Sequence, residues 1–124
     1  MGRNVVPPIL RDSDRFGTVY IMAPMVMYGK KSLAIRKHYL ENALPGTILL
    51  YPDELFTSNS DWLESIDGLI SDCDCGILVS EKNRIVGYGC FVETKLLKSA
   101  GKPVFYLHYA RKILTREFFL YTRL

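Results

Sequence analysis

The sequence predicts an α/β fold with a mostly parallel sheet of four to five strands, covered by helices on both faces. Four short segments are almost wholly apolar, which is typical of strands buried on both sides. Helical patterns separate these segments, as in successive β-α-β crossovers. The length of 124 residues and the hydrophobic fraction of 48% suit one domain with a sizeable core.

The first half of the chain is expected to hold an arm and a β-α-β unit. Paired prolines within residues 1–16 forbid regular helix, so this segment is expected to be an irregular arm before a single domain at 17–124. The β-branched and aromatic run at 18–22 predicts a strand. Apolar residues at helical spacing predict a helix over about 31–44, and an apolar run predicts a strand at 47–51.

The second half is expected to continue the alternation of helices and strands. Asn59 or Ser60 is expected to cap a helix with one apolar side, and an apolar run at 76–79 predicts the third strand. A Gly-rich turn is expected to open a helix over about 91–99, with Gly101 as its C-cap. The remaining expected elements are a strand at 103–107 and a helix at 110–124 with strand character near 118–121.

The composition excludes several classes of protein. A charged fraction of 23% beside this hydrophobic content is ordinary for a globular chain and excludes a disordered or fibrous one. No apolar run approaches the roughly 18 residues of a membrane span. The N-terminus lacks the apolar stretch of a secretory signal, and 3 cysteines suit a reducing compartment. A cytoplasmic protein without membrane association is therefore expected.

A ligand site is expected where parallel strands end, because ligands of open α/β sheets bind at the carboxyl ends of strands. The turns concerned follow Met22, Tyr51, Val79 and Leu107. The first of them leads into a loop and a helix start with two ammonium groups, a hydroxyl and free N–H groups, which suit a 5′-phosphate. The residues of this loop are Tyr28, Lys30, Lys31 and Ser32. A solvated loop is an equally weighted alternative.

The turn after the third strand carries the most informative residues. Gly87 and Gly89 precede a helix and let the backbone approach a ligand closely. Glu93 is expected in the first turn of that helix, where the helix dipole favours its ionised form. An ionised, positioned carboxylate is what attack on a sugar C1′ requires. The alternative, which is commoner for such spacing, is that Glu93 only caps the helix or lies on its surface without a functional role.

Four motifs occur in order over about residues 18–108. They are Tyr20-Ile-Met-Ala-Pro-Met25, Asp74-Cys-Gly-Ile-Leu-Val79, Gly87-Tyr-Gly-Cys-Phe-Val-Glu93 and Ser99-Ala-Gly-Lys-Pro-Val104. In this order they resemble the nucleoside 2-deoxyribosyltransferase-like family, including its deoxynucleotide N-hydrolase branch. The resemblance implies a flavodoxin-like or Rossmann-like three-layer fold. It also implies cleavage or transfer of the N-glycosidic bond of a nucleoside or nucleotide, with Glu93 as nucleophile, and a homo-oligomer such as a dimer.

The expected site departs from the family at two positions and in one spacing, because the interval from Gly89 to Glu93 is one residue longer than in the nucleotide-hydrolase branch. Gly87 stands where many transferases have a carboxylate used near the base, and Ala23 stands where Gly is frequent. The acid that protonates the departing base is therefore open among Asp61, Asp67 and Asp74, with Asp61 favoured by analogy and an N-terminal helix charge as its alternative. The expected substrate-binding residues are Ala23, Pro24, Met25, Tyr28, Lys30, Lys31, Ser32, Asp74, Gly87, Tyr88 and Gly89.

Other classes of partner are not expected. The cysteines and two histidines lack the number and spacing of zinc ligands, and neither a metal nor a cofactor is predicted. The net charge of +3 does not indicate nucleic acid, which needs a basic stripe with stacking aromatics. Tyr20 and Trp62 could stack on a base, although core packing is commoner. A nucleotide-binding or sensing module that does not cleave its ligand is the alternative to an enzyme, and Gly87 favours it.

Overall fold

The computed structural model describes residues 17–81, 85–116 and 121–122, so the arm expected at 1–16 lies outside the described residues. The main sheet has five strands in the order β2-β1-β3-β5-β6. Its strands are β1 (Thr18–Met22), β2 (Ile48–Leu50), β3 (Cys75–Leu78), β5 (Val104–His108) and β6 (Ile113–Thr115). The first four run parallel, and β6 runs antiparallel beside β5. The predicted α/β fold with a mostly parallel sheet is confirmed.

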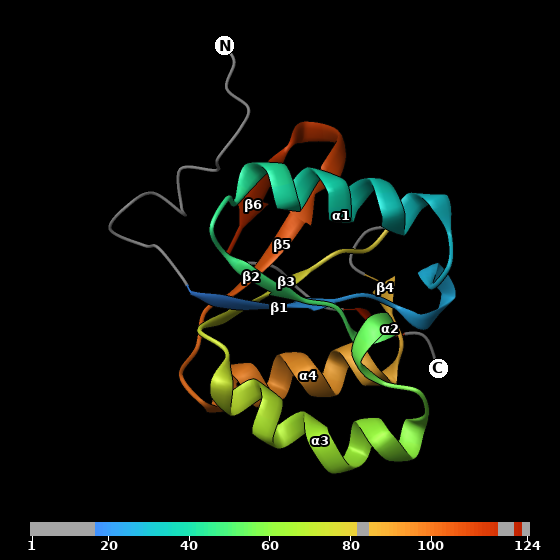
Figure 1. The fold of residues 1–124 in the computed structure, drawn as a ribbon, viewed down its shortest axis with the longest axis vertical. Helices are drawn as coiled ribbons and strands as arrows, with labels where there is room; N and C mark the ends of the chain where they lie inside the picture. The colour runs from blue at the N-terminus through green and yellow to red at the C-terminus, as the bar shows by residue number, and fades with distance from the viewer. Residues whose placement is uncertain (1–16, 82–84, 117–120, 123–124) are drawn as a thin grey trace.

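Helices cover both faces of this sheet (Figure 1). Helix α1 (Lys31–Ala43) lies on one face, and α3 (Asn59–Asp72) and α4 (Tyr88–Ser99) lie side by side on the other. The short elements are α2 (Pro52–Leu55), the 3-10 turns η3 (Met25–Met27) and η4 (Tyr109–Arg111), and the paired strands β4 (Ile85–Val86) and β7 (Tyr121–Thr122). Three layers with this strand order form the predicted flavodoxin-like arrangement.

Alternate residues of β1 build two cores. Val19 and Ile21 belong to the core under α1, whereas Tyr20 and Met22 belong to the core under α3 and α4, as the two-residue period of a strand dictates. Gly76 in β3 lets α4 pack closely, because a Cβ at this position would overlap the side chain of Leu97. Tyr20 therefore points toward α4, on the side of the sheet where Glu93 lies.

The beginnings of α3 and α4 differ from the prediction. Ser58, rather than Asn59 or Ser60, caps α3, since its hydroxyl accepts a hydrogen bond from the Asp61 N–H. Helix α4 begins at Tyr88, because Gly87 in an extended conformation is its N-cap and the second glycine is helical. Glu93 therefore lies in the second turn of α4 and not in the first.

The helix expected at 110–124 is wrong for the described residues 110–116 and 121–122. Lys112 adopts a left-handed conformation with φ 56°, which turns the chain back after β5. The β-branched residues Ile113 and Thr115 then form β6 as an antiparallel neighbour of β5. The strand character expected near 118–121 lies outside the described residues except for Tyr121, which belongs to β7.

The connections define a switch point at the carboxyl edge of the sheet. After β1 the chain passes to α1 on one face, and after the neighbouring β3 it passes to α4 on the other. Adjacent strands that depart to opposite faces leave a place for ligands between their carboxyl ends. Among the described residues, no helix combines the length and apolar character needed to span a bilayer.

Candidate functional site

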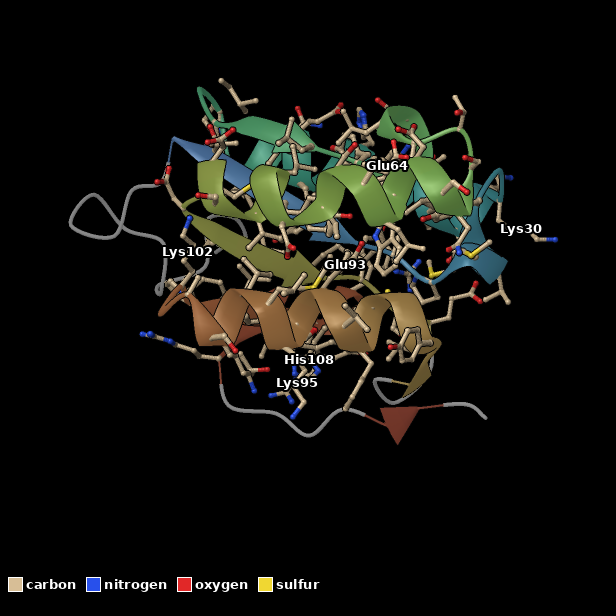
Figure 2. All side chains as sticks on the ribbon, turned by 90° about the horizontal axis from the view of Figure 1, so that it is seen from below. Lys30, Glu64, Glu93, Lys95, Lys102 and His108 are labelled. Carbon is tan, nitrogen blue, oxygen red and sulfur yellow. The ribbon has the colours of Figure 1, made fainter. Side chains whose placement is uncertain are left out.

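Glu93 is buried on the inner side of α4. Its side chain lies between α3 and α4, whereas Lys95 on the same helix points outward (Figure 2). Only 3% of Glu93 is exposed. A carboxyl group this deep needs hydrogen-bond partners, because burial without them costs several kcal/mol.

Two aromatic side chains supply these partners. The Tyr20 hydroxyl donates to Glu93 Oε2 at 2.5 Å, and the Trp62 indole N–H donates to the same oxygen at 2.7 Å. The donors come from β1 and α3, so three elements hold one carboxyl group. No described residue donates a hydrogen bond to Oε1. The two oxygens of Glu93 therefore have different surroundings.

The environment of Glu93 sets its ionisation near neutral pH. Burial raises the pKa of Glu93 to about 7, against the opposing effect of the hydrogen bonds from Tyr20 and Trp62. In contrast to the expectation from the helix dipole, Glu93 is therefore not fully ionised at neutral pH, because it lies beyond the first turn of α4 and inside the protein. Burial and the charge of Glu93 raise the pKa of Tyr20, so its hydroxyl stays a donor at any ordinary pH.

Tyr28 and Cys90 complete what we call the Glu93 cluster, which consists of Tyr20, Tyr28, Trp62, Cys90 and Glu93. Burial raises the pKa of Tyr28, and the nearby charge of Glu93 raises it further. The same two causes raise the pKa of Cys90, which is buried one turn before Glu93. Cys90 is therefore a neutral thiol rather than a nucleophilic thiolate.

The loop predicted to bind phosphate is only partly brought to the cluster. Tyr28 lies near Glu93, whereas Lys30 and Lys31 are exposed at the start of α1. The Lys30 side chain extends away from Glu93 (Figure 2). The Ser32 hydroxyl accepts a hydrogen bond from Arg36 Nη1 at 2.6 Å. The cations thus stand at the surface, near the end of β1, and form no described contact with Glu93.

The other predicted substrate contacts surround the carboxyl end of β1 and the start of α4. Ala23 and Pro24 are buried after β1, while Met25 is 77% exposed. Gly87 is exposed, Tyr88 is 73% exposed, and an added Cβ at Gly87 or Gly89 would touch nothing within 4 Å. The two glycines are therefore not required by packing and leave open surface at the start of α4.

The structure separates two predicted carboxylates from Glu93. Asp74 Oδ2 accepts hydrogen bonds from the Gly17 and Thr18 N–H groups at 2.8 and 2.9 Å, at the amino ends of β1 and β3. Asp61 Oδ2 accepts from the Thr57 N–H at 3.1 Å and so helps to cap α3. Asp74 thus stands at the wrong edge of the sheet for a substrate contact, and Asp61 has the N-terminal helix role that was its alternative.

Sequence reasoning passed over Asp53 in α2. Burial raises the pKa of Tyr28, and the charge of Asp53, like that of Glu93, raises it further. Asp53 Oδ2 forms a 2.8 Å ion pair with the Lys37 ammonium group. The available signal is its place in the turn that follows β2 and Tyr51, at one of the strand ends where a site is expected.

Sequence reasoning also missed the partnership between Trp62 and Glu93. The sequence predicts Trp62 only as a stacking or core residue, yet a partly buried indole N–H normally finds an acceptor. Its acceptor is 31 positions away, on another helix. Only the packing of α3 against α4 identifies that acceptor.

The thiols and acids form no described metal centre. Within residues 17–81, 85–116 and 121–122, no three His, Cys, Asp or Glu side chains gather in a way that could hold an ion. Cys73 and Cys75 are buried, and burial raises their pKa values to about 11 and about 12. These neutral thiols serve the packing of α3 and β3.

The fold and the cluster define an α/β protein with a buried, hydrogen-bonded carboxyl group beside the switch point of its sheet. No family model, curated protein or solved structure matches the chain. A carboxyl group with a pKa near 7 can act as a nucleophile or base when ionised and as an acid when protonated.

Proposed function

We propose that this protein cleaves or transfers the N-glycosidic bond of a nucleoside or nucleoside 5′-monophosphate, with Glu93 as the nucleophile. One observation carries the proposal: Tyr20 and Trp62 both bind Oε2 of Glu93, which leaves Oε1 without a described donor. The order of motifs that resembles the nucleoside 2-deoxyribosyltransferase-like family supports the choice of substrate. A cytoplasmic homo-oligomer remains part of the proposal.

The proposed reaction proceeds in two displacements at C1′ of the sugar. Oε1 of ionised Glu93 attacks C1′, the C1′–N bond breaks, and its electron pair leaves with the base, which takes up a proton. The resulting sugar ester is then attacked at C1′ by a second base or by water, which gives up a proton and restores the carboxylate. Positioned donors on Oε2 stabilise the carboxylate as the leaving group of this second step.

The proposed phosphate contact lies at the start of α1. Lys30 and Lys31 are exposed cations there, and the first-turn N–H groups of this 13-residue helix favour an anion. A 5′-monophosphate would then extend from the Glu93 cluster toward the surface. Nucleoside 5′-monophosphates are accordingly expected to react faster than the corresponding nucleosides.

The experiment that tests this function is incubation with pooled nucleosides and 5′-monophosphates, with mass detection of free bases. The wild-type protein is expected to release a base or exchange it with an added one. Glu93→Gln is the matched control, because the amide keeps the size and can still accept from Tyr20 and Trp62 but cannot form the ester. Equal base release by both proteins contradicts the role of Glu93, and no release from any substrate contradicts the proposed activity.

A non-catalytic nucleotide-binding or sensing module is the second candidate. The observation that favours it is that no described hydrogen bond or ion pair joins a second carboxylate to Glu93, and that Gly87 supplies none. A binding module predicts a higher melting temperature with a nucleotide and no free base after long incubation. Thermal unfolding beside the base-release assay therefore separates the two functions.

A further inference from the structure

We infer that Trp62 is a positioning residue, whose indole N–H determines which oxygen of Glu93 is presented to the substrate. The inference rests on the proposed function and deepens it. Its structural basis is the hydrogen bond of 2.7 Å from Trp62 Nε1 to Glu93 Oε2. Trp62 donates to Oε2 of Glu93 and not to Oε1, the oxygen proposed to attack C1′, so its action is exerted through the carboxylate.

Two donors on one oxygen determine the orientation of a planar carboxyl group. A single donor would let Glu93 pivot about the Oε2 hydrogen bond. Tyr20 and Trp62 approach the same oxygen from β1 and from α3, so such a pivot breaks one hydrogen bond or the other. The side chain is thereby held in one rotamer, and Oε1 is held apart from both donors. Nucleophilic attack gains from this restriction, because the reacting oxygen is oriented before substrate binds.

The first turn of α3 holds Trp62 in place. The Ser58 hydroxyl caps this helix, and the Ser58 carbonyl accepts the backbone N–H of Trp62 at 3.1 Å. Asp61 adds a hydrogen bond to the Thr57 N–H. The Trp62 ring packs against the core under α3 and α4, while the neighbouring Leu63 is exposed. Trp62 is therefore a fixed side chain of α3 that reaches a carboxyl group on α4.

Electrostatics separates a positioning role from a merely structural one. A structural indole needs some acceptor, and a neutral acceptor would serve it as well. A hydrogen bond to a carboxylate is stronger than one to a neutral carboxyl group, so the Trp62 N–H favours the ionised form of Glu93. Among the described residues, the titratable side chains whose pKa values respond to Glu93 are Tyr20, Tyr28 and Cys90, which are all neutral, and Glu93 raises the pKa of each. Removal of the indole N–H is therefore expected to shift the ionisation of Glu93 toward higher pH.

A direct test uses the fact that Trp62 is the only tryptophan of the chain. Its indole N–H gives a single signal in a ¹H–¹⁵N spectrum of the wild-type protein, so no substitution is needed to observe it. The signal is expected to move as pH rises through about 7, where Glu93 ionises. In Glu93→Gln the signal is expected to remain at one position over the same range. A wild-type signal that does not titrate overturns the inference.

The kinetic test uses Trp62→Phe, which keeps an aromatic ring and removes the N–H. The acid limb of kcat/KM for base release is expected to move up by about one pH unit. This shift lowers kcat/KM about fivefold at pH 7, whereas near pH 9 the variant and the wild type have the same kcat/KM. If Trp62→Phe lowers kcat/KM by the same factor at all pH values, Trp62 has only a structural role, and this result overturns the inference.

Matched variants complete the design. Tyr51→Phe likewise removes an aromatic hydrogen-bond donor from a carboxylate, in this case the hydroxyl that donates to Glu41 on the α1 side of the sheet, and it is expected to leave the pH profile unchanged. Trp62→His retains an N–H donor and is expected to restore part of the shift. If Trp62→Phe does not fold, the pH profile of Trp62→His replaces it, and a wild-type indole signal that does not titrate still overturns the inference. If the wild-type protein releases no base, the proposed function fails, whereas the indole titration separately shows whether Trp62 responds to Glu93.

Discussion

Tyr20 and Glu93 are 73 positions apart in the chain, yet the Tyr20 hydroxyl lies 2.5 Å from Glu93 Oε2. The parallel pairing of β1 with β3 makes this possible, because it sets Tyr20 beside Gly76 in the register of the sheet. The absence of a side chain at Gly76 then lets α4 come close enough for Glu93 to reach the hydroxyl. The site is thus a product of strand register and helix packing together.

The pH dependence of base release is the first consequence of the buried carboxyl group. Because the pKa of Glu93 is about 7 and the nucleophile must be ionised, kcat/KM is expected to rise with pH and level off above about pH 8. Base release from the preferred substrate, measured from pH 5 to pH 9, checks this. A rate that falls as pH rises through 7 would instead indicate that protonated Glu93 acts as the acid.

Stability should depend on Glu93 in the opposite sense to activity. The pKa of Glu93 is raised in the folded protein from its ordinary 4.5 to about 7, so its contribution to the free energy of unfolding is fully present below pH 4.5 and lost as pH rises through 7. At pH 8 the buried, ionised Glu93 lowers the free energy of unfolding by about 3 kcal/mol relative to its value below pH 4.5. Glu93→Gln is therefore expected to unfold at a higher temperature than wild type at pH 8 and at a similar temperature near pH 4.5. Thermal unfolding at these two pH values checks the prediction, which a less stable variant at pH 8 would contradict.

Position 87 offers a gain-of-function prediction. Gly87 is the exposed N-cap of α4 with φ −84° and ψ −175°, and an added Cβ meets nothing within 4 Å. Asp at an N-cap is at least as favourable as Gly, so Gly87→Asp should fold with stability within a few tenths of a kcal/mol of wild type. If the missing carboxylate limits protonation of the base, base release should rise about tenfold. Gly87→Asn is the control, because it caps the helix equally well without an acid, and equal rates for the two variants would exclude the acid effect.

Much of the fold follows from local sequence patterns. The β-branched and apolar runs predict β1, β2, β3 and β5 to within one residue of their bounds. Strands β1, β3 and β5 are buried on both faces and so have an almost continuous apolar sequence, whereas the edge strand β2 is apolar but exposed or half-buried. The helix predicted after β5 is wrong because the turn there depends on Lys112 in a left-handed conformation. Glycine or asparagine is the usual sequence signal for this conformation, and neither occurs at this position. The predicted start of α4 is three residues late, because the sequence predicts Gly87 and Gly89 both in a turn, whereas Gly89 is helical.

The site is less accessible to sequence reasoning than the fold. Glu93 is identifiable from its place in an ordered set of motifs, but its burial and its raised pKa depend on side chains from β1 and α3. Asp74, in contrast, resembles a site residue in the sequence but lies away from the site in the structure. An aspartate before an apolar strand resembles a site residue, yet it lies at the amino edge of the sheet and binds the Gly17 and Thr18 N–H groups. Which edge a residue occupies is determined by strand direction, and not by motif similarity.

Lys102 gives a prediction about stability that is independent of the site. Its ammonium group donates to the carbonyl oxygens of Ile70, Ser71 and Cys73 at 2.9, 2.7 and 2.6 Å, at the C-terminal end of α3. Lys102 and Lys30 lie at opposite ends of the molecule (Figure 2). Lys102→Met should lower the free energy of unfolding by about 1–2 kcal/mol, because three carbonyls lose a charged donor at a helix C-terminus.

Denaturant unfolding measures this effect, and base release at 25 °C serves as its control. The variant is expected to keep the wild-type rate, since the Glu93 cluster does not include Lys102. An unchanged unfolding midpoint would contradict the capping role of Lys102. A reduced rate in fully folded protein would show that the end of α3 influences the cluster.

The most direct test of the account is capture of the proposed ester on Glu93. A nucleoside with fluorine at C2′ slows formation and breakdown of the ester by destabilising positive charge at C1′. The account predicts release of one base per protein molecule, an increase in protein mass by one fluorosugar, and location of that mass on the peptide that contains Glu93. Turnover of the natural substrate without any adduct, or an adduct on another residue, would contradict it.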